Sequence, residues 1–228
     1  MSSPSRCPIS DDAENGSGDL RLLTTLTDVK PWDGWYRAPV TSPAAARSDG
    51  NGPRDSAATT TGDVYPLGYR WLIKGPIDVV FDLLSHACDY PTWWSPCFKS
   101  AESDDEVVVG ARSHLRVRSR LPYELVWDIT LTELDPPTFI EVDTIVRLSG
   151  RFPLRGPIRY TLTDGLDGVE VVNDQVIVSE RRLPRPLRAL LQRAFAYNHA
   201  WAFRIGGRGL QQAVDRVVAA RAAGSAGA

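Results

Sequence analysis

The feature that most constrains the fold is a long run of alternating apolar and polar residues, followed by a single helix-like segment. Within residues 97–180, apolar side chains recur at every second position, as in Leu125, Trp127, Ile129 and Leu131. Such one-sided alternation is typical of antiparallel strands with one face on a core and one face in water. It predicts strands at residues 114–118, 125–132, 140–147, 158–163 and 169–178.

The residues before this run predict one more strand and two short helices. Tyr69, Trp71 and Ile73 recur at strand spacing, and Pro76 then suits the first turn of a helix. The stretch DYPTWW at 89–94 predicts a second short helix or a turn. Either both tryptophans cap the core there, or at least one lines an internal pocket.

A long amphipathic helix is predicted for residues 183–222. Gly206, Gly207 and Gly209 interrupt its apolar pattern, and each costs roughly 1 kcal/mol relative to alanine inside a helix. They predict a kink or a close approach to the sheet.

Residues 1–62 are rich in Ser, Pro, Gly, Asp, Ala and Thr and carry almost no aliphatic pattern. Such a segment is expected to be mostly disordered. A Trp-containing island at 30–39 either folds back onto the domain or binds a partner. The sequence thus predicts one ligand-binding domain at 63–222 and a flexible tail at 223–228.

In this order of elements the chain resembles the SRPBCC superfamily of START-related, birch-pollen-allergen-like helix-grip proteins, and within it the polyketide cyclase/dehydratase-like group. The resemblance rests on the strand with Trp71, PIDVVFDLL (76–84), DYPTWW (89–94), LPYELVWDITLTELDPP (121–137) and NHAWAFRIGGRGL (198–210). It implies an α+β helix-grip fold, a curved antiparallel sheet wrapped around a long C-terminal helix with two short helices after the first strand.

One loop departs from that group. Where relatives often have a Gly-Asp-Leu-x-Gly turn, this chain has GRFPLRGPIRY at 150–160, with Arg151 in place of the acid. Tyr160 still lies where the resemblance implies an inward aromatic residue.

Several classes of function are disfavoured. The net charge of −2 does not point to nucleic acid, and no phosphate-binding loop occurs. The spacing of His86, Cys88, Cys97 and His114 fits no zinc site, so neither metal nor cofactor is expected.

The sequence also carries an expectation about the compartment. Three cysteines without paired spacing favour free thiols. The chain has neither an apolar run for a membrane nor a signal peptide at its start, so a cytoplasmic location is expected.

A cavity of a few hundred cubic ångströms is expected between the last helix and the inner sheet face. The candidate ligand-binding residues are Trp94, Trp127, Tyr160, Asn173, Gln175, Phe195, Asn198 and His199. Periodicity does not decide which phase of the last strand faces inward, but the resemblance favours the phase of Asn173 and Gln175. If it is the other phase, Asp174 is the polar group of the pocket.

Acid–base chemistry has few candidates. His199 is a weak catalytic candidate, since a helical histidine is more often structural. Asp128, Glu141, Asp143, Arg116 and Arg118 occupy the polar phase of their strands and are expected on a solvated outer face.

Two functions remain open. The first is binding of a hydrophobic small molecule such as a polyketide, lipid or isoprenoid; the alternative is a polyketide cyclase/dehydratase-type enzyme that orients its substrate in the cavity. Arg182, Arg185 and Arg188 are expected at the cavity mouth, either as a solvated basic face or as a gate for an anionic ligand, a carrier protein or an anionic membrane surface.

Overall fold

The computed structural model describes residues 5–6, 62–104, 106–120, 124–148, 152–180 and 182–226. Most of the segment predicted to be disordered, and the whole island at 30–39, lie outside these residues. So does Arg151 in the altered loop.

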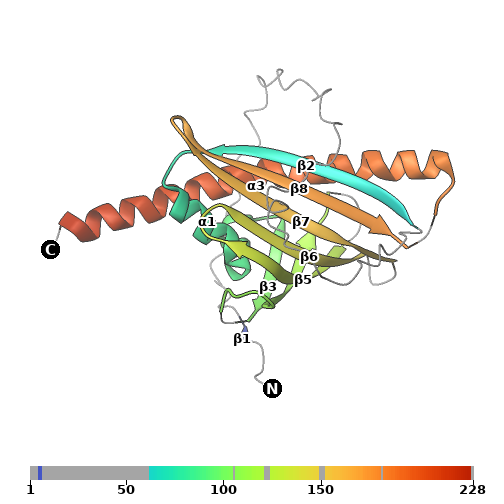
Figure 1. Cartoon of the computed structure of the whole chain (residues 1–228), viewed down its shortest axis with the longest axis horizontal. Helices are drawn as coiled ribbons and strands as arrows, with labels where there is room; N and C mark the ends of the chain where they lie inside the picture. The colour runs from blue at the N-terminus through green and yellow to red at the C-terminus, as the bar shows by residue number, and fades with distance from the viewer. Residues whose placement is uncertain are drawn as a thin grey trace, which may run out of the picture. The chain divides into compact units, whose positions relative to one another are not determined.

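An antiparallel sheet of eight strands forms the body of the described chain, in the order β1-β3-β4-β5-β6-β7-β8-β2. Figure 1 shows its long strands curving over α3. The strands are β1 (Ser5–Arg6), β2 (Asp63–Ile73), β3 (Phe98–Ser103), β4 (Arg112–Arg118), β5 (Glu124–Asp135), β6 (Phe139–Leu148), β7 (Phe152–Gly165) and β8 (Gly168–Ser179). All the strands predicted from the alternation are present, and the predicted α+β helix-grip fold is confirmed.

The register across the sheet brings distant residues into rows on its inner face. Asn173 on β8 pairs with Tyr69 on β2 and with Tyr160 on β7, and Tyr160 pairs in turn with Ile140 on β6. Because side chains alternate between the two faces of a strand, this row fixes which phase of β8 points toward the helix.

The helices lie where the sequence predicts them, with small changes at their ends. They are α1 (Ile77–Ser85), the 3₁₀ turn η3 (Ala87–Asp89), α2 (Tyr90–Trp93) and α3 (Arg185–Ala226). The stretch DYPTWW forms the end of η3 and all of α2. The long helix spans 42 residues without a break at its glycines and ends four residues beyond the predicted Ala222.

A cluster of aromatic side chains fixes α3 against the sheet and the short helices. The rings of Trp93 and Trp94 stack with centroids 5.1 Å apart, and both are buried. The indole N–H of Trp94 donates to the Ala202 carbonyl, and that of Trp71 to the Phe203 carbonyl, each at 2.8 Å. The two bonds join the sheet and α2 to one turn of α3.

The glycines of α3 allow this close approach. A Cβ atom at Gly206 would lie 2.3 Å from Cε2 of Trp94, and one at Gly209 would lie 1.6 Å from the Trp93 carbonyl oxygen. The predicted close approach is therefore present, chiefly to the tryptophans after α1, and the predicted kink is not needed.

The cysteines differ from the expectation. Cys97 is free and buried, and burial raises the pKa of its thiol to about 12. Cys88 is disulfide-bonded, so the prediction of a free thiol is wrong at that position.

Candidate functional site

Two cavities lie on the inner face of the sheet. The first, here called the short-helix cavity, lies beside α1, η3 and α2 and has a volume of about 50 Å³. The second, the long-helix cavity, lies between α3 and the sheet and has a volume of about 60 Å³. The prediction of one cavity of a few hundred cubic ångströms is wrong in size, because aromatic side chains fill much of the space.

Three side chains line both cavities: Phe98, Trp127 and Tyr160. The rings of Phe98 and Trp127 meet edge to face with centroids 6.1 Å apart. These residues form the boundary at which the two cavities come closest.

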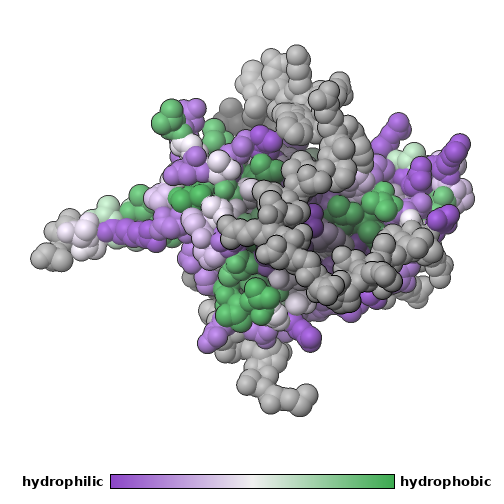
Figure 2. All heavy atoms as spheres, in the orientation of Figure 1, coloured by the Kyte–Doolittle hydropathy of each residue, from purple (hydrophilic) through white to green (hydrophobic). Residues whose placement is uncertain are grey.

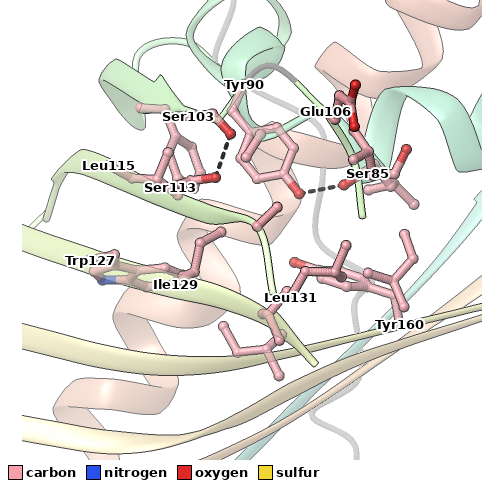
Figure 3. A pocket seen from close by; sticks show the side chains of 18 residues that line it. Ser85, Tyr90, Ser103, Glu106, Ser113, Leu115, Trp127, Ile129, Leu131 and Tyr160 are labelled. Atoms are coloured by element: carbon pink, nitrogen blue, oxygen red, sulfur yellow. Dashed lines mark hydrogen bonds between the residues drawn. The ribbon is translucent and has the colours of Figure 1, made fainter. Parts of the chain in front are cut away.

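The short-helix cavity, seen in Figure 3, has a few polar groups on an apolar wall. Ser103 and Ser113 share a hydrogen bond of 2.7 Å, and the Tyr90 hydroxyl donates to the Leu84 carbonyl at 2.6 Å. The Tyr160 hydroxyl points into the cavity (Figure 3). Burial, with a smaller contribution from Tyr90, raises the pKa of Tyr160 well above its usual value, so this hydroxyl is neutral.

The long-helix cavity brings together most of the candidate residues. Those that line it are Trp94, Trp127, Tyr160, Gln175, Phe195, Asn198 and His199. Asn173 lies just behind this wall and contacts His199. Trp94 lines the cavity and Trp93 does not, so the adjacent tryptophans have different surroundings.

The last strand turns its amide residues inward. Asn173 and Gln175 are 1% and 2% exposed, whereas Asp174 is exposed on the outer face. The phase favoured by the resemblance is therefore the inner one, and Asp174 is not a polar group of either cavity.

His199 is a buried and neutral histidine. Its Nε2 atom lies 3.2 Å from Oδ1 of Asn173 and donates to it in the Nε2–H tautomer. Its ring stacks on Phe203 with centroids 4.1 Å apart. Burial lowers the pKa of His199 to about 3, so the ring is a poor proton acceptor near neutral pH.

No charged side chain lines the long-helix cavity among the described residues, and Glu106 is the charged residue at the rim of the short-helix cavity. No cluster of histidine, cysteine and carboxylate side chains in this part of the chain could hold a metal ion.

Charged residues gather instead on the outer face of the sheet, as expected. Asp128 lies 2.6 Å from Nδ1 of His114 and also pairs with Arg147. Glu141 pairs with Arg159. These ion pairs bridge neighbouring strands in the solvent.

The three arginines that were predicted at the cavity mouth line neither of the two cavities. Arg182, Arg185 and Arg188 are exposed at the beginning of α3, and Arg188 lies 3.8 Å from the Asp63 carboxylate. The cavity wall begins further along the helix, at Phe195.

The sequence reasoning missed the short-helix cavity. Its wall includes Leu84, Tyr90, Phe98, Ser103 and Ser113, from segments whose contacts the alternation does not reveal. The aromatic residues of DYPTWW and the following Phe98 were the one sequence signal that could have indicated this cavity.

Comparison with known proteins defines the fold. The chain matches no model of a protein family and no curated protein. A protein of unknown function from Staphylococcus aureus matches with a TM-score of 0.53 and 10% identity, over 69% of this chain and 98% of that chain. The Zhui aromatase/cyclase from Streptomyces sp. R1128 matches with a TM-score of 0.50 and 17% identity, over 68% of this chain and 96% of that chain.

A START superfamily protein from Mycobacterium smegmatis also matches, with a TM-score of 0.48 and 12% identity over 67% of this chain and 99% of that one. None of the helices in the described ranges is long and apolar enough to cross a membrane. The curved antiparallel sheet, the short helices after its first long strand and the likeness to the aromatase/cyclase together show that this chain has a helix-grip fold.

Proposed function

We propose that the protein binds an uncharged, mainly apolar small molecule with a carbonyl or hydroxyl group in the long-helix cavity. The observation that carries this proposal is a pair of polar groups on the cavity wall: the Gln175 amide, which forms no hydrogen bond with a described residue, and the Trp127 indole N–H, which is buried without a partner there. A buried amide without a partner destabilises a folded protein, so it is rarely kept without another role. A ligand oxygen would provide that missing partner.

The lining also favours an uncharged ligand. A carboxylate or phosphate placed in the long-helix cavity would meet no lysine or arginine among the described lining residues. Burying an unpaired charge is far more costly than burying a carbonyl group. The exposed arginines of α3 therefore do not act as a counter-charge inside this cavity.

Ligand size depends on the boundary between the two cavities. About 60 Å³ suits a small ring, and a polyketide, lipid or isoprenoid needs Phe98 and Trp127 to move so that both cavities join. Pockets for such ligands usually measure about 300–1,000 Å³.

Cyclase-type catalysis is the alternative, and the likeness to the aromatase/cyclase supports it at the level of fold. The acid–base groups favour binding, since His199 is a very weak base and no carboxylate lines the long-helix cavity in the described chain. The candidate for catalysis that remains is orientation of a reactive ligand by the cavity walls.

A cytoplasmic location stays a prediction. The disulfide bond at Cys88 weighs against it, because such bonds are typical of oxidising compartments.

Titration with three probes of one shape tests the proposal: acetophenone, benzoate and ethylbenzene, each followed by NMR chemical-shift changes. The ketone is expected to bind most tightly, because it alone combines an apolar ring with an uncharged oxygen. In Gln175→Met the affinity for acetophenone should fall about fivefold, the value of one hydrogen bond, while that for ethylbenzene stays unchanged. Native mass spectrometry of the freshly purified protein would identify any retained ligand.

The same substitution should stabilise the empty protein. Methionine has nearly the shape of glutamine and removes the unpaired amide, so the free energy of unfolding is expected to rise by about 1–2 kcal/mol. Gln212→Met, at an exposed position of α3, is the matched control and should change neither property. Equal binding of benzoate and acetophenone, or an unaltered ketone affinity in Gln175→Met, would contradict the proposal.

A further inference from the structure

Residues 182–193, at the beginning of α3 and just before it, carry a surface that the cavity does not use. It consists of four arginines and two leucines, here called the basic–apolar end: Arg182, Arg185, Leu187, Arg188, Leu190 and Arg193. Leu187 is 42% exposed and Leu190 is 62% exposed. Leu187 and Leu190 are three positions apart, so they lie on the same face of the helix and form an exposed apolar pair there.

This part of the helix has little contact with the sheet. Every residue from Arg185 to Leu190 is exposed, whereas Phe195, five residues after Leu190, is buried. Figure 1 shows α3 beginning beyond the end of the strands, and Figure 2 shows mostly hydrophilic residues there with a few hydrophobic ones among them. Packing against the domain therefore does not explain the two leucines.

The charge around the leucines is of one sign. No acidic residue occurs from 182 to 214. Among the described residues, Asp63 lies near this region; it is itself buried, accepts the Leu183 N–H at 2.6 Å and lies 3.8 Å from Arg188. Within the described ranges, neither Arg185 nor Arg193 forms an ion pair.

Local helix stability does not explain the arginines. The N-terminus of a helix carries a partial positive charge, so arginines in the first turn weaken the helix. A row of cations that costs local stability and flanks exposed leucines is typical of helices that lie in the interface of a membrane.

We propose that the basic–apolar end binds the surface of an anionic lipid bilayer. Leu187 and Leu190 enter the boundary between headgroups and acyl chains, and the arginines contact the lipid phosphates. A protein partner would need an acidic groove of matching shape, whereas a bilayer needs only negative charge and an apolar layer, which are the two properties that this surface complements.

The placement also relates the surface to the cavity. Phe195 and His199, which line the long-helix cavity, follow Arg193 on the same helix by two and six positions. A protein bound to lipid through this end would hold that cavity within a few turns of the bilayer. The surface proposal nevertheless stands on its own, because it requires no ligand in either cavity.

Co-sedimentation of the full chain with vesicles tests the proposal. Binding is expected to vesicles of phosphatidylcholine mixed with phosphatidylglycerol, and not to phosphatidylcholine alone. It should weaken as salt is raised, because the arginines are exposed and screened. The double variant Arg185→Gln/Arg193→Gln should bind anionic vesicles at least about tenfold more weakly, because each arginine near an anionic surface contributes substantially to the binding free energy. The double variant Leu187→Gln/Leu190→Gln should also bind anionic vesicles more weakly than the original protein. Its loss of binding should depend less on salt than the loss in the arginine variant.

Matched controls come from the same chain. Arg204→Gln/Arg208→Gln removes two exposed charges from a later part of α3, and Leu166→Gln removes a fully exposed leucine from the turn between β7 and β8. Both should bind anionic vesicles like the original protein. All variants change exposed side chains, and circular dichroism verifies that they fold.

Three results would overturn the proposal. One is equal binding to neutral and anionic vesicles, and another is equal loss of binding in the control variants. The third is self-association of the protein, seen by analytical ultracentrifugation, that disappears in Leu187→Gln/Leu190→Gln; it would assign the surface to a second copy of the chain. Failure of the probe titration in the long-helix cavity would leave these vesicle results unaffected.

Discussion

Replacing Gly209 with alanine is expected to destabilise the protein by about 3 kcal/mol or more, although alanine is the better helix former. The added Cβ atom would lie 1.6 Å from the backbone carbonyl oxygen of Trp93. Backbone at this distance cannot move aside without separating α3 from α2. The loss from overpacking therefore exceeds the gain of roughly 1 kcal/mol in helix propensity. Urea unfolding of the two proteins measures the difference.

Gly224→Ala is the matched control in the same helix. A Cβ atom at Gly224 would meet nothing within 4 Å, so the substitution should leave stability unchanged or raise it by a few tenths of a kcal/mol. Equal stability of Gly209→Ala and the original protein would show that α3 does not approach Trp93 so closely.

Acidification should destabilise the protein through His199. The unfolded chain protonates this ring below about pH 6.5, whereas the folded protein, in which burial lowers the pKa, protonates it only near pH 3. The unfolded state therefore binds more protons between these values, and stability falls as the pH is lowered from 6.5 toward 3. Over that range the shift amounts to a loss on the order of 4 kcal/mol.

The variant His199→Gln isolates this effect, because glutamine can donate to Asn173 and does not titrate. Denaturant unfolding at several pH values should give a shallower decline for the variant than for the original protein below pH 6.5. Parallel declines would mean that the histidine is already protonated in the folded state.

The sheet could be predicted where its residues alternate without interruption. In β5 the apolar phase is continuous, and the predicted strand matches the structure closely. β3 gave no clear signal, because its register shifts between Phe98 and Ser100 and the buried residues Phe98 and Ala101 are three apart. An irregularity of this kind removes the period of two on which the prediction depends.

The site was predictable in part for a different reason. Val172 and Val176 are nearly as apolar as Val171 and Ile177, so the alternation in β8 does not identify its inner face. The resemblance to other helix-grip proteins favoured the inner phase that contains Asn173 and Gln175. The role of these residues in ligand binding stays a prediction.

The cavity size could not be predicted from the sequence. It depends on how Phe98, Trp127 and Tyr160 turn their rings, and a rotation of one ring changes the enclosed space without changing the backbone. Sequence patterns specify which residues face inward and do not specify their rotamers.

The stacked pair of Trp93 and Trp94 gives the protein an internal optical reporter. Two indole rings with centroids 5.1 Å apart and planes inclined by 21° couple their electronic transitions, which produces a near-ultraviolet circular dichroism signal. Gly206 and Gly209 allow α3 to pack closely against this pair. Separation of the helix from the domain would therefore alter the signal even while the helix stays intact. The near-ultraviolet spectrum would then change before the far-ultraviolet one, as it does when tertiary packing is lost ahead of secondary structure. Spectroscopy alone could thus separate release of the long helix from its unfolding.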